Sequence, residues 1–589
     1  MDLIVNTNLL KHLTHMLDRS KPTEPIVEGM MSKPLCPMNL PNRMPLPRKS
    51  PEETGYSSAD LSAFFAEVIA EPTLSLHGIL IVRDGAVICD ASFGAYRSDL
   101  YHVGHSLSKS VTATAIGLLI DEGRLSLDDR VVRLLEKRLP PFAQLTYKNL
   151  TVRHLLTMTS GASFSEAGAM VETHWLRAYF ESLVRFEPGK QFAYNSMNSY
   201  VLAALVREVS GLPMREYLKR RLFDPMGITL WHWETSPEGI EAGGWGLYLC
   251  REDTAKLGLL YLNGGLWQGK RLLSERWVKQ AVTASVSTPE SCGDFDYGFH
   301  IWVGRTHRSF LFNGMFGQDM LAFRDSRTLI VTNGSLEQIF QQSVYYEILA
   351  RYFASASDRS LPKNPQAAKR LARQLSTLKA EERLPSVSAP LPAWLKAVLG
   401  VTYRYRNPSN DEIIRTDLRN GTGNLSLLPF LEQMLRNRYA KGLRSFTVTR
   451  NGKRLVLHAV EGDTELLVPF FPNRTVRSVV RISETDYHTA VTASLAKDED
   501  GRGVIKLQID FPEIASTRFL KLYFDGESME VRMTERPGLG LSAHFISAVE
   551  ELLRGRKRVA DLVSRLDPNL LFYKLEQTLE PSFRFWRTP

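Results

Sequence analysis

The chain has 589 residues, of which 43% are hydrophobic and 23% are charged, a composition typical of globular proteins rather than fibrous or disordered ones. This length predicts several domains. The net charge of +9 is modest for such a chain, and it argues against the clustered basicity that dominates nucleic-acid binders. The four cysteines are scattered, with no Cys-x-x-Cys and no histidines at zinc spacing, so we expect neither a disulfide framework nor a structural metal.

The N-terminus shows no export signal. Residues 1–17 carry charges between short apolar pieces, without a basic region ahead of an apolar one. No stretch of the sequence reaches the roughly 18 apolar residues that a membrane-spanning helix needs. We therefore expect a cytoplasmic protein without a membrane span, provided that Met1 is the true start.

The first elements follow a proline-rich beginning. Residues 20–50 contain many prolines, which neither donate to a sheet nor fit inside a helix, so we expect an irregular lead-in. Residues 59–70 place apolar side chains at helical spacing. Two short strands at 77–82 and 86–91 follow, and the Asp84-Gly85 pair between them predicts a hairpin.

Helical stretches come next, and strands return at 309–313 and 320–331. Strands at both ends with helices between them predict an antiparallel sheet that both ends of one domain close. A charged helical segment at 366–382 then leads into the Pro/Ser-rich residues 385–392, which are the best linker candidate.

Beyond the linker the pattern has period two. The predicted strands lie at 445–449, 454–458, 465–471, 504–509, 519–524 and 529–533, and a helix is predicted at 542–565. The predicted fold class is α+β, a helix-flanked antiparallel sheet domain followed by a strand-rich C-terminal domain. The chain is thus divided into a lead-in at 1–50, a first domain at 51–358, a helix and linker at 359–392, and a β-rich accessory domain at 393–589.

The segment with chemical interest begins at Ser106. It reads Ser106-Leu-Ser-Lys109, and an apolar pattern at helical spacing continues until Gly123 ends the helix. Ser106 is predicted in the first turn, with Lys109 one turn later on the same face. A lysine held out of water loses part of its proton affinity and can help to deprotonate a neighbouring serine, while the helix N-terminus favours the oxyanion.

The Ser-x-x-Lys pattern alone is weak, because the chain contains it four times. Ser360 has a proline directly before its lysine, and Ser376 lies in the charged helix ahead of the linker. Ser494 precedes the charged run Lys-Asp-Glu-Asp, which is typical of an exposed loop. Only Ser106 opens a long apolar helix, which favours Ser106 as the nucleophile.

Several further motifs occur in a fixed order over roughly residues 50–350. They are His105-Ser-Leu-Ser-Lys109, Gly117-Leu-Leu-Ile-Asp-Glu-Gly123, Leu150-Thr-Val-Arg-His-Leu-Leu-Thr-Met-Thr-Ser-Gly161, Phe186-Glu-Pro-Gly189, Leu222-Phe-Asp-Pro-Met-Gly227 and Gly243-Gly-Trp-Gly246. Together they resemble the class C beta-lactamase family, which also contains DD-peptidases, carboxylesterases and 6-aminohexanoate-dimer (nylon oligomer) hydrolases. The resemblance implies the two-lobed beta-lactamase/transpeptidase-like fold, with Ser106 as nucleophile.

The resemblance assigns roles to three more positions. Its second motif, Tyr-x-Ser, reads Tyr194-Asn-Ser196 here. It implies that Tyr194, as a phenolate held by Lys109, shuttles protons. Ser196 would bind the substrate or the lysine, although Asn195 and Asn198 remain alternatives. Tyr-x-Ser resembles the version found in members that cleave amides and esters.

The third motif, Lys-Thr-Gly or His-x-Gly, aligns with Met315-Phe316-Gly317. A methionine replaces the basic or polar residue that holds a substrate carboxylate in beta-lactam- and peptidoglycan-recognising members, so we expect those activities to be weak. The resemblance places the oxyanion hole at the backbone N–H groups of Ser106 and Gln318, and backbone donors survive side-chain changes.

Other residues are weaker candidates. Aromatic side chains in segments that border the cleft in this family are Trp175, Trp245, Tyr248, Tyr297 and Trp302, and for each a place in the core is the simpler interpretation. His105 and His154 are expected to be structural. The basic run at 554–558 lies on a predicted helix without interleaved aromatics, so a solvated face is favoured over a nucleic-acid site.

These observations predict a serine hydrolase that cleaves small esters or amides through an acyl-enzyme on Ser106. It would act with Lys109, Tyr194, Ser196 and Gln318 and would require no metal or cofactor. Two alternatives remain: a peptidase or amidase acting on D-amino-acid or cyclic peptides, and a catalytically silent binding module. The sequence predicts no nucleic-acid partner and leaves the oligomeric state open.

Overall fold

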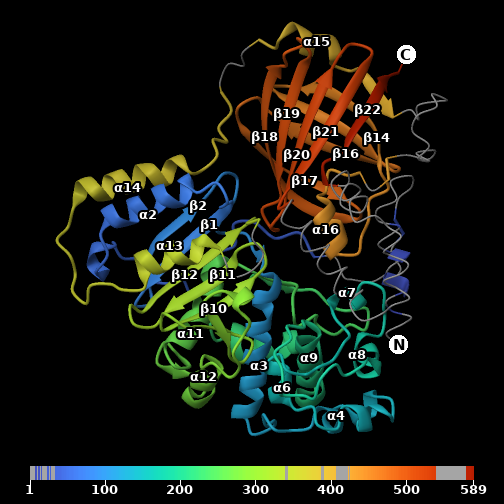
Figure 1. Cartoon of the computed structure of the whole chain (residues 1–589). Helices are drawn as coiled ribbons and strands as arrows, with labels where there is room; N and C mark the ends of the chain where they lie inside the picture. Colours follow the sequence, from blue (N-terminus) through green and yellow to red (C-terminus); the bar gives the residue numbers. More distant parts are fainter. Residues whose placement is uncertain are drawn as a thin grey trace. The chain divides into compact units, whose positions relative to one another are not determined.

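The computed structural model describes residues 33–337, 343–385, 390–405, 422–423, 425–538 and 579–588, with isolated residues before residue 28. The chain forms two compact units (Figure 1). The first contains Met1–Val5 and Gly29–Lys379, and the second contains Asn6–Glu28 and Ala380–Pro589. The predicted helix at 542–565, with its basic run, lies outside the described residues. The finer four-part division of the chain stays a prediction.

The first unit is built on a seven-stranded antiparallel sheet with the order β2-β1-β12-β11-β10-β9-β8 within its described residues. Its strands are β1 Leu76–Arg83, β2 Ala86–Ser92, β8 Phe295–Tyr297, β9 Trp302–Gly304, β10 Ser309–Gly314, β11 Gln318–Phe323 and β12 Thr328–Gly334. Strands β1 and β12 pair with Ile81 opposite Ile330. The two ends of the domain therefore close one sheet, as predicted.

One predicted strand was wrong. Residues 320–331 form parts of two strands, β11 and β12, which are joined by a turn at 324–327. This turn consists of Arg-Asp-Ser-Arg, and Arg327 adopts a φ of 49°. The turn contains neither glycine nor proline, and its Asp325-Ser326 pair is a weaker turn signal that the prediction overlooked.

Helices cover both faces of this sheet (Figure 1). Three helices contribute to the apolar core on one face, namely α2 Ser58–Ala70, α13 Val344–Phe353 and α14 Pro365–Thr377. Helix α11, Arg251–Leu262, packs against β1, β11 and β12. The predicted helix at 59–70 is confirmed, and its N-cap Ser57 accepts a hydrogen bond from the Asp60 N–H, as serine caps do.

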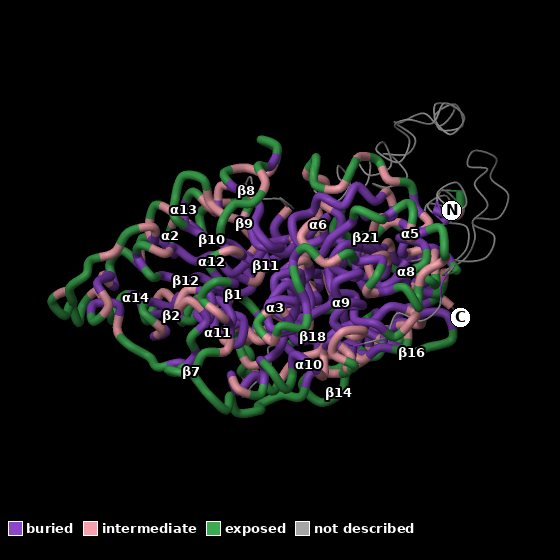
Figure 2. Tube along the Cα trace, turned by 90° about the horizontal axis from the view of Figure 1, so that it is seen from below, coloured by how far each residue is buried: buried purple, intermediate pink, exposed green. Residues whose placement is uncertain are grey.

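The remaining helices form a mainly helical region beside the sheet. They are α3 Ser108–Asp121, α4 Val131–Leu134, α5 Ala143–Thr146, α6 Val152–Leu156, α7 Glu166–Ala169, α8 Trp175–Glu181, α9 Met197–Ser210, α10 Met214–Leu218 and α12 Glu275–Ala281. Short strands accompany them: β3 His102–Val103, β4 Trp231–Trp233, β5 Leu247–Leu249, β6 Leu266–Trp267 and β7 Lys270–Arg271. Helices α3 and α9 pack together, and both run through the buried interior (Figure 2).

The second unit is strand-rich, as predicted. Its described residues form a ten-stranded sheet with the order β16-β15-β14-β13-β22-β21-β20-β19-β18-β17. The strands are β13 Thr402–Tyr405, β14 Leu443–Asn451, β15 Arg454–Glu461, β16 Thr464–Phe470, β17 Thr475–Ile482, β18 Thr485–Lys497, β19 Gly503–Asp510, β20 Thr517–Phe524, β21 Ser528–Arg536 and β22 Ser582–Arg587. Two short helices, α15 Ala393–Val398 and α16 Phe430–Leu435, belong to it.

Together, these elements confirm the predicted α+β class. Among the helices of the described residues, none combines the length and the apolar character that crossing a membrane requires.

Candidate active site

Ser106 lies in a 3₁₀ turn, η2 (His105–Leu107), that runs directly into helix α3. The turn packs against β10 and β11. The residue before the serine, His105, has a φ of 45°, a left-handed conformation that is uncommon outside glycine and is concentrated at functional sites. Ser106 is half-buried, so its hydroxyl group stands between the protein interior and solvent.

Lys109 is fully buried beneath this serine, with 1% of its surface exposed. Its Nζ lies 2.8 Å from the Ser106 Oγ and 2.8 Å from the carbonyl oxygen of Gly244. Burial lowers the pKa of Lys109 to about 7, and the negative charge of Glu166 works in the opposite direction. Near neutral pH a large fraction of Lys109 is therefore an uncharged amine, which can accept a proton.

Tyr194 completes the cluster above the lysine. The Nζ of Lys109 lies 4.8 Å from the centroid of the Tyr194 ring. This ring stacks on the Trp302 ring, with 5.9 Å between the two ring centroids. Burial raises the pKa of Tyr194, although its hydrogen bond to Ser106 works against the rise. The phenol is thus the favoured form, and this differs from the expected phenolate because desolvation outweighs the effect of the Ser106 hydrogen bond on the pKa.

Ser196 makes a contact that the sequence did not suggest. Its hydroxyl donates to the carboxylate of Glu166, with 3.2 Å between the oxygens. Glu166 begins the short helix α7 and is exposed. Its charge acts on both Lys109 and Tyr194. The sequence carried no usable signal for Glu166, because it stands in no motif of the resemblance.

The two asparagines beside Ser196 have structural contacts. The Asn195 amide donates to the carbonyls of Ala162 and Phe164, and Asn198 accepts hydrogen bonds from Ser160 and Tyr179. Both amides are buried. These hydrogen bonds hold the Asn195 and Asn198 side chains within the core. Ser196 is the residue of this motif that contacts Glu166.

Gln318 begins β11, directly after the turn that contains Met315, Phe316 and Gly317. Phe316 and Gly317 have φ values of 65° and 80°, so the chain reverses sharply here. A Cβ on Gly314 would lie 2.1 Å from the carbonyl oxygen of Gly104. This close approach brings the start of β11 toward the turn that carries Ser106. Met315 is half-buried.

Of the aromatic candidates, four are core residues. Trp175, Tyr248, Tyr297 and Trp302 are at most 5% exposed. Trp245 is half-buried and directly follows Gly244, whose carbonyl accepts from Lys109.

The two histidines have structural contacts. The ring of His154 accepts a hydrogen bond from the Thr151 N–H in the capping box of α6. The ring of His105 packs edge-on against Phe316. Both contacts agree with the expected structural role.

The other Ser-x-x-Lys pairs lie in different settings. Ser360 and its lysine are exposed, and the exposed Ser376 donates to the Arg373 carbonyl on α14. Ser494 lies within strand β18 rather than next to a loop. Residues three apart in a strand point to opposite faces, so Lys497 cannot meet the Ser494 hydroxyl.

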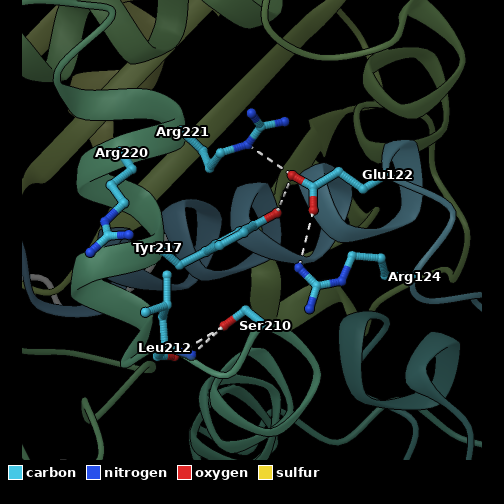
Figure 3. Close-up of a pocket in the computed structure, with 7 residues that line it drawn as sticks. All are labelled: Glu122, Arg124, Ser210, Leu212, Tyr217, Arg220 and Arg221. Carbon is cyan, nitrogen blue, oxygen red and sulfur yellow. Dashed lines mark hydrogen bonds and ion pairs between the residues drawn. The ribbon is translucent and has the colours of Figure 1, made fainter.

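A pocket of about 330 Å³ lies beyond the C-terminal end of α3, the end opposite Ser106. Figure 3 shows the residues that line it. Its central carboxylate, Glu122, accepts from Tyr217 at 3.0 Å and pairs with Arg221 at 2.8 Å and Arg124 at 3.5 Å. The carboxylate is thus neutralised within the protein. Because the C-terminal ends of α3 and α9 also meet here, their dipoles disfavour an anion, and we assign no chemistry to this pocket.

Comparison with known proteins relates most of the first unit to a known family. Residues 61–337 match the family model described as Beta-lactamase. A 6-aminohexanoate-dimer hydrolase of Paenarthrobacter ureafaciens is 27% identical over 226 residues, which cover 34% of this chain and 56% of that protein. Penicillin-binding protein 4* of Bacillus subtilis is 29% identical over 243 residues, covering 34% of this chain and 51% of that protein. The chain thus spans about half the length of these relatives.

Among solved structures, an octameric penicillin-binding protein homologue from Pyrococcus abyssi matches with a TM-score of 0.40 and 17% identity. The match covers 80% of this chain and 97% of that chain. The expected beta-lactamase/transpeptidase-like fold class is confirmed by the family match and by the sheet and helices described above. The resemblance to the beta-lactamase family is thus confirmed over residues 61–337.

Proposed function

We propose that this protein is a serine hydrolase that cleaves small esters or amides through an acyl-enzyme on Ser106. The observation that carries the proposal is the contact between Ser106 and a buried lysine, with 2.8 Å between the Lys109 Nζ and the Ser106 Oγ. A binding module would gain nothing from this arrangement, because burying a lysine without a carboxylate partner costs stability.

In the proposed reaction, the Ser106 Oγ attacks the carbonyl carbon of the substrate while the uncharged Lys109 accepts the hydroxyl proton. The backbone N–H groups of Ser106 and Gln318 stabilise the tetrahedral oxyanion. As the C–O or C–N bond breaks, Tyr194 donates its phenolic proton to the leaving group and regains one from Lys109. Water then attacks the acyl-enzyme with the same groups in reverse order.

The expected substrates are uncharged near the scissile bond. Met315 offers no cation to a substrate carboxylate, and Glu166 adds a negative charge beside Ser196. Both features disfavour anionic substrates. The 6-aminohexanoate-dimer hydrolase among the relatives is named for an amide substrate, and this supports the inclusion of amides with esters.

The deciding experiment compares Ser106→Ala with Ser376→Ala and Ser494→Ala in the full chain. Short p-nitrophenyl esters, amide oligomers and a serine-reactive fluorophosphonate serve as probes. We expect Ser106→Ala alone to abolish hydrolysis and labelling, because the other two serines have no buried lysine beside them. Persisting turnover or labelling in Ser106→Ala would refute the proposal.

A further inference from the structure

The side chain of Gln318 is held in place by several hydrogen bonds. The carboxamide is completely buried, and its Nε2 donates to the carbonyls of Phe316 at 3.1 Å and Gly334 at 2.7 Å. Its Oε1 accepts from Asn333 at 3.3 Å. These bonds connect the turn before β11 with the end of β12. They restrain β11 on one face, at the residue whose N–H is the proposed oxyanion donor.

The next residue, Asp319, fixes the opposite face of the strand, since successive side chains alternate between faces. Its Oδ1 accepts from the Asn313 amide at 2.7 Å, and its Oδ2 accepts from the Tyr346 hydroxyl at 2.8 Å. The Asn313 amide also lies 3.2 Å from the Tyr346 oxygen. Asn313 is directly opposite Asp319 in the β10–β11 pair, and Tyr346 comes from α13.

We call Asp319, Asn313 and Tyr346 the Asp319 triad, and the burial of its carboxylate costs folding free energy. Asp319 is 1% exposed, and the groups that stabilise its charged form are the neutral Tyr346 and Asn313 side chains and the Gly314 backbone. Burial raises the pKa of Asp319 to about 7, against the effect of the bonds from Tyr346 and Asn313. A neutral side chain at this position would cost less free energy to bury. Packing alone therefore does not explain why a carboxylate stands here.

We propose that Asp319 and Tyr346 are positioning residues, which hold the Gln318 backbone N–H in place for the oxyanion of the proposed hydrolysis. The inference rests on the proposed function. The turn at 315–317 contains two consecutive left-handed residues, so the chain reverses directly before Gln318. The triad and the Gln318 carboxamide therefore fix where β11 begins relative to Ser106.

The chain offers a matched pair of variants on helix α13. Tyr346→Phe removes the hydroxyl that binds Asp319, whereas Tyr345→Phe removes a neighbouring hydroxyl, 2.8 Å from the Thr332 Oγ1. Tyr345 is buried and Tyr346 is half-buried, and each variant loses one hydroxyl. A general weakening of the core would affect Tyr345→Phe at least as strongly as Tyr346→Phe, but only Tyr346→Phe removes a hydrogen bond to the strand that carries the proposed oxyanion donor.

The two variants are compared in the full chain by steady-state hydrolysis of a short p-nitrophenyl ester and by inhibition with a small alkyl boronic acid, whose tetrahedral adduct mimics the oxyanion. Because a misplaced donor of this kind costs roughly 10–100-fold, Tyr346→Phe should lower kcat and boronic-acid affinity by about that factor. KM should stay close to that of the parent protein, and the melting temperature should fall by a similar amount in the two variants, since each loses one hydrogen-bonded hydroxyl. Tyr345→Phe should leave kcat, KM and boronic-acid affinity unchanged.

A kcat and boronic-acid affinity within about twofold of the parent in Tyr346→Phe would overturn the inference, as would equal losses in the two variants. The double exchange Asn313→Asp with Asp319→Asn keeps one carboxylate and one amide across the strand pair. It should recover part of the kcat that Asp319→Asn alone loses. Failure of the proposed function itself is recognised separately, by residual activity in Ser106→Ala.

Discussion

Lys109 determines the pH range in which the proposed chemistry operates. Its pKa of about 7 results from burial, opposed by the charge of Glu166. The uncharged amine is the base, so kcat/KM should rise with pH as Lys109 loses its proton. The charge of Glu166 favours protonated Lys109. The rise in kcat/KM should therefore occur at a higher pH than burial alone would give.

Replacing Glu166→Gln removes that charge, which lowers the pKa of Lys109 further. The Lys109 amine is then uncharged at lower pH, so the rise in kcat/KM should move to lower pH. For an exposed carboxylate the shift should be roughly 0.2–0.7 pH units. The measurement is a pH–rate profile with an uncharged ester, with exposed Glu187→Gln as control. A shift toward higher pH would contradict the assignment of Lys109 as the base.

Tyr194 is the group proposed to carry the proton to the leaving group. Tyr194→Phe keeps the ring that stacks on Trp302 but removes the hydroxyl. We expect kcat to fall by about 10²–10⁴-fold, the usual contribution of a general acid or base, with the thermal unfolding transition preserved. A fall of less than about threefold in stopped-flow or steady-state assays would show that the hydroxyl is only structural.

At the scale of elements, the site is assembled where three of them meet. The turn η2 presents Ser106, helix α3 carries Lys109 beneath it, and the β10–β11 pair approaches through Gly314. In the proposed reaction, the β10–β11 turn would influence specificity as well as the oxyanion site, because Met315 is part of it. The resemblance places this apolar, adaptable methionine where a substrate carboxylate would need a cation.

We therefore expect clear turnover of short uncharged esters and very poor turnover of penicillins or cephalosporins. Charge-assisted hydrogen bonds contribute roughly 1.5–3 kcal/mol, so the missing cation corresponds to about 10–150-fold in discrimination. Met315→Lys should recover part of this factor for a chromogenic cephalosporin. If the parent protein hydrolysed the cephalosporin as efficiently as its best ester, another residue would supply the cation, and the alignment of Met315 would be wrong.

At the scale of the whole molecule, all proposed catalytic residues belong to the first unit. The second unit has its own core, which includes a fully buried ion pair between Arg518 and Glu535 at 2.9 Å. Separate cores are the mark of units that can fold alone. We propose that the strand-rich unit is an accessory domain that takes no part in the chemical step.

A protein truncated to residues 29–379 should accordingly fold and hydrolyse a short ester with kcat/KM within about threefold of the full chain. Circular dichroism and the ester assay test this expectation. A folded truncation without activity would show that the second unit contributes to the site. A truncation that does not fold would show that the two units depend on each other for stability.

The sequence by itself determined the features that depend on local patterns. Helical spacing predicted the helix after Ser106 and its end at Gly123, whose φ of 69° is the left-handed conformation of a helix stop. Period-two patterns predicted six strands of the second unit, since one face of each is buried. The ordered motifs indicated the family, and with it Ser106, Lys109 and Tyr194 as neighbours.

Only the tertiary structure decided what depends on contacts between distant segments. The protonation states of Lys109 and Tyr194 follow from burial, which no local pattern reports. Glu166 lies 30 positions from Ser196, and Tyr346 lies 27 positions from Asp319, with no fixed spacing to reveal either pair. Such contacts arise when the sheet closes and the helices pack, and there they set the charge and the rigidity of the site.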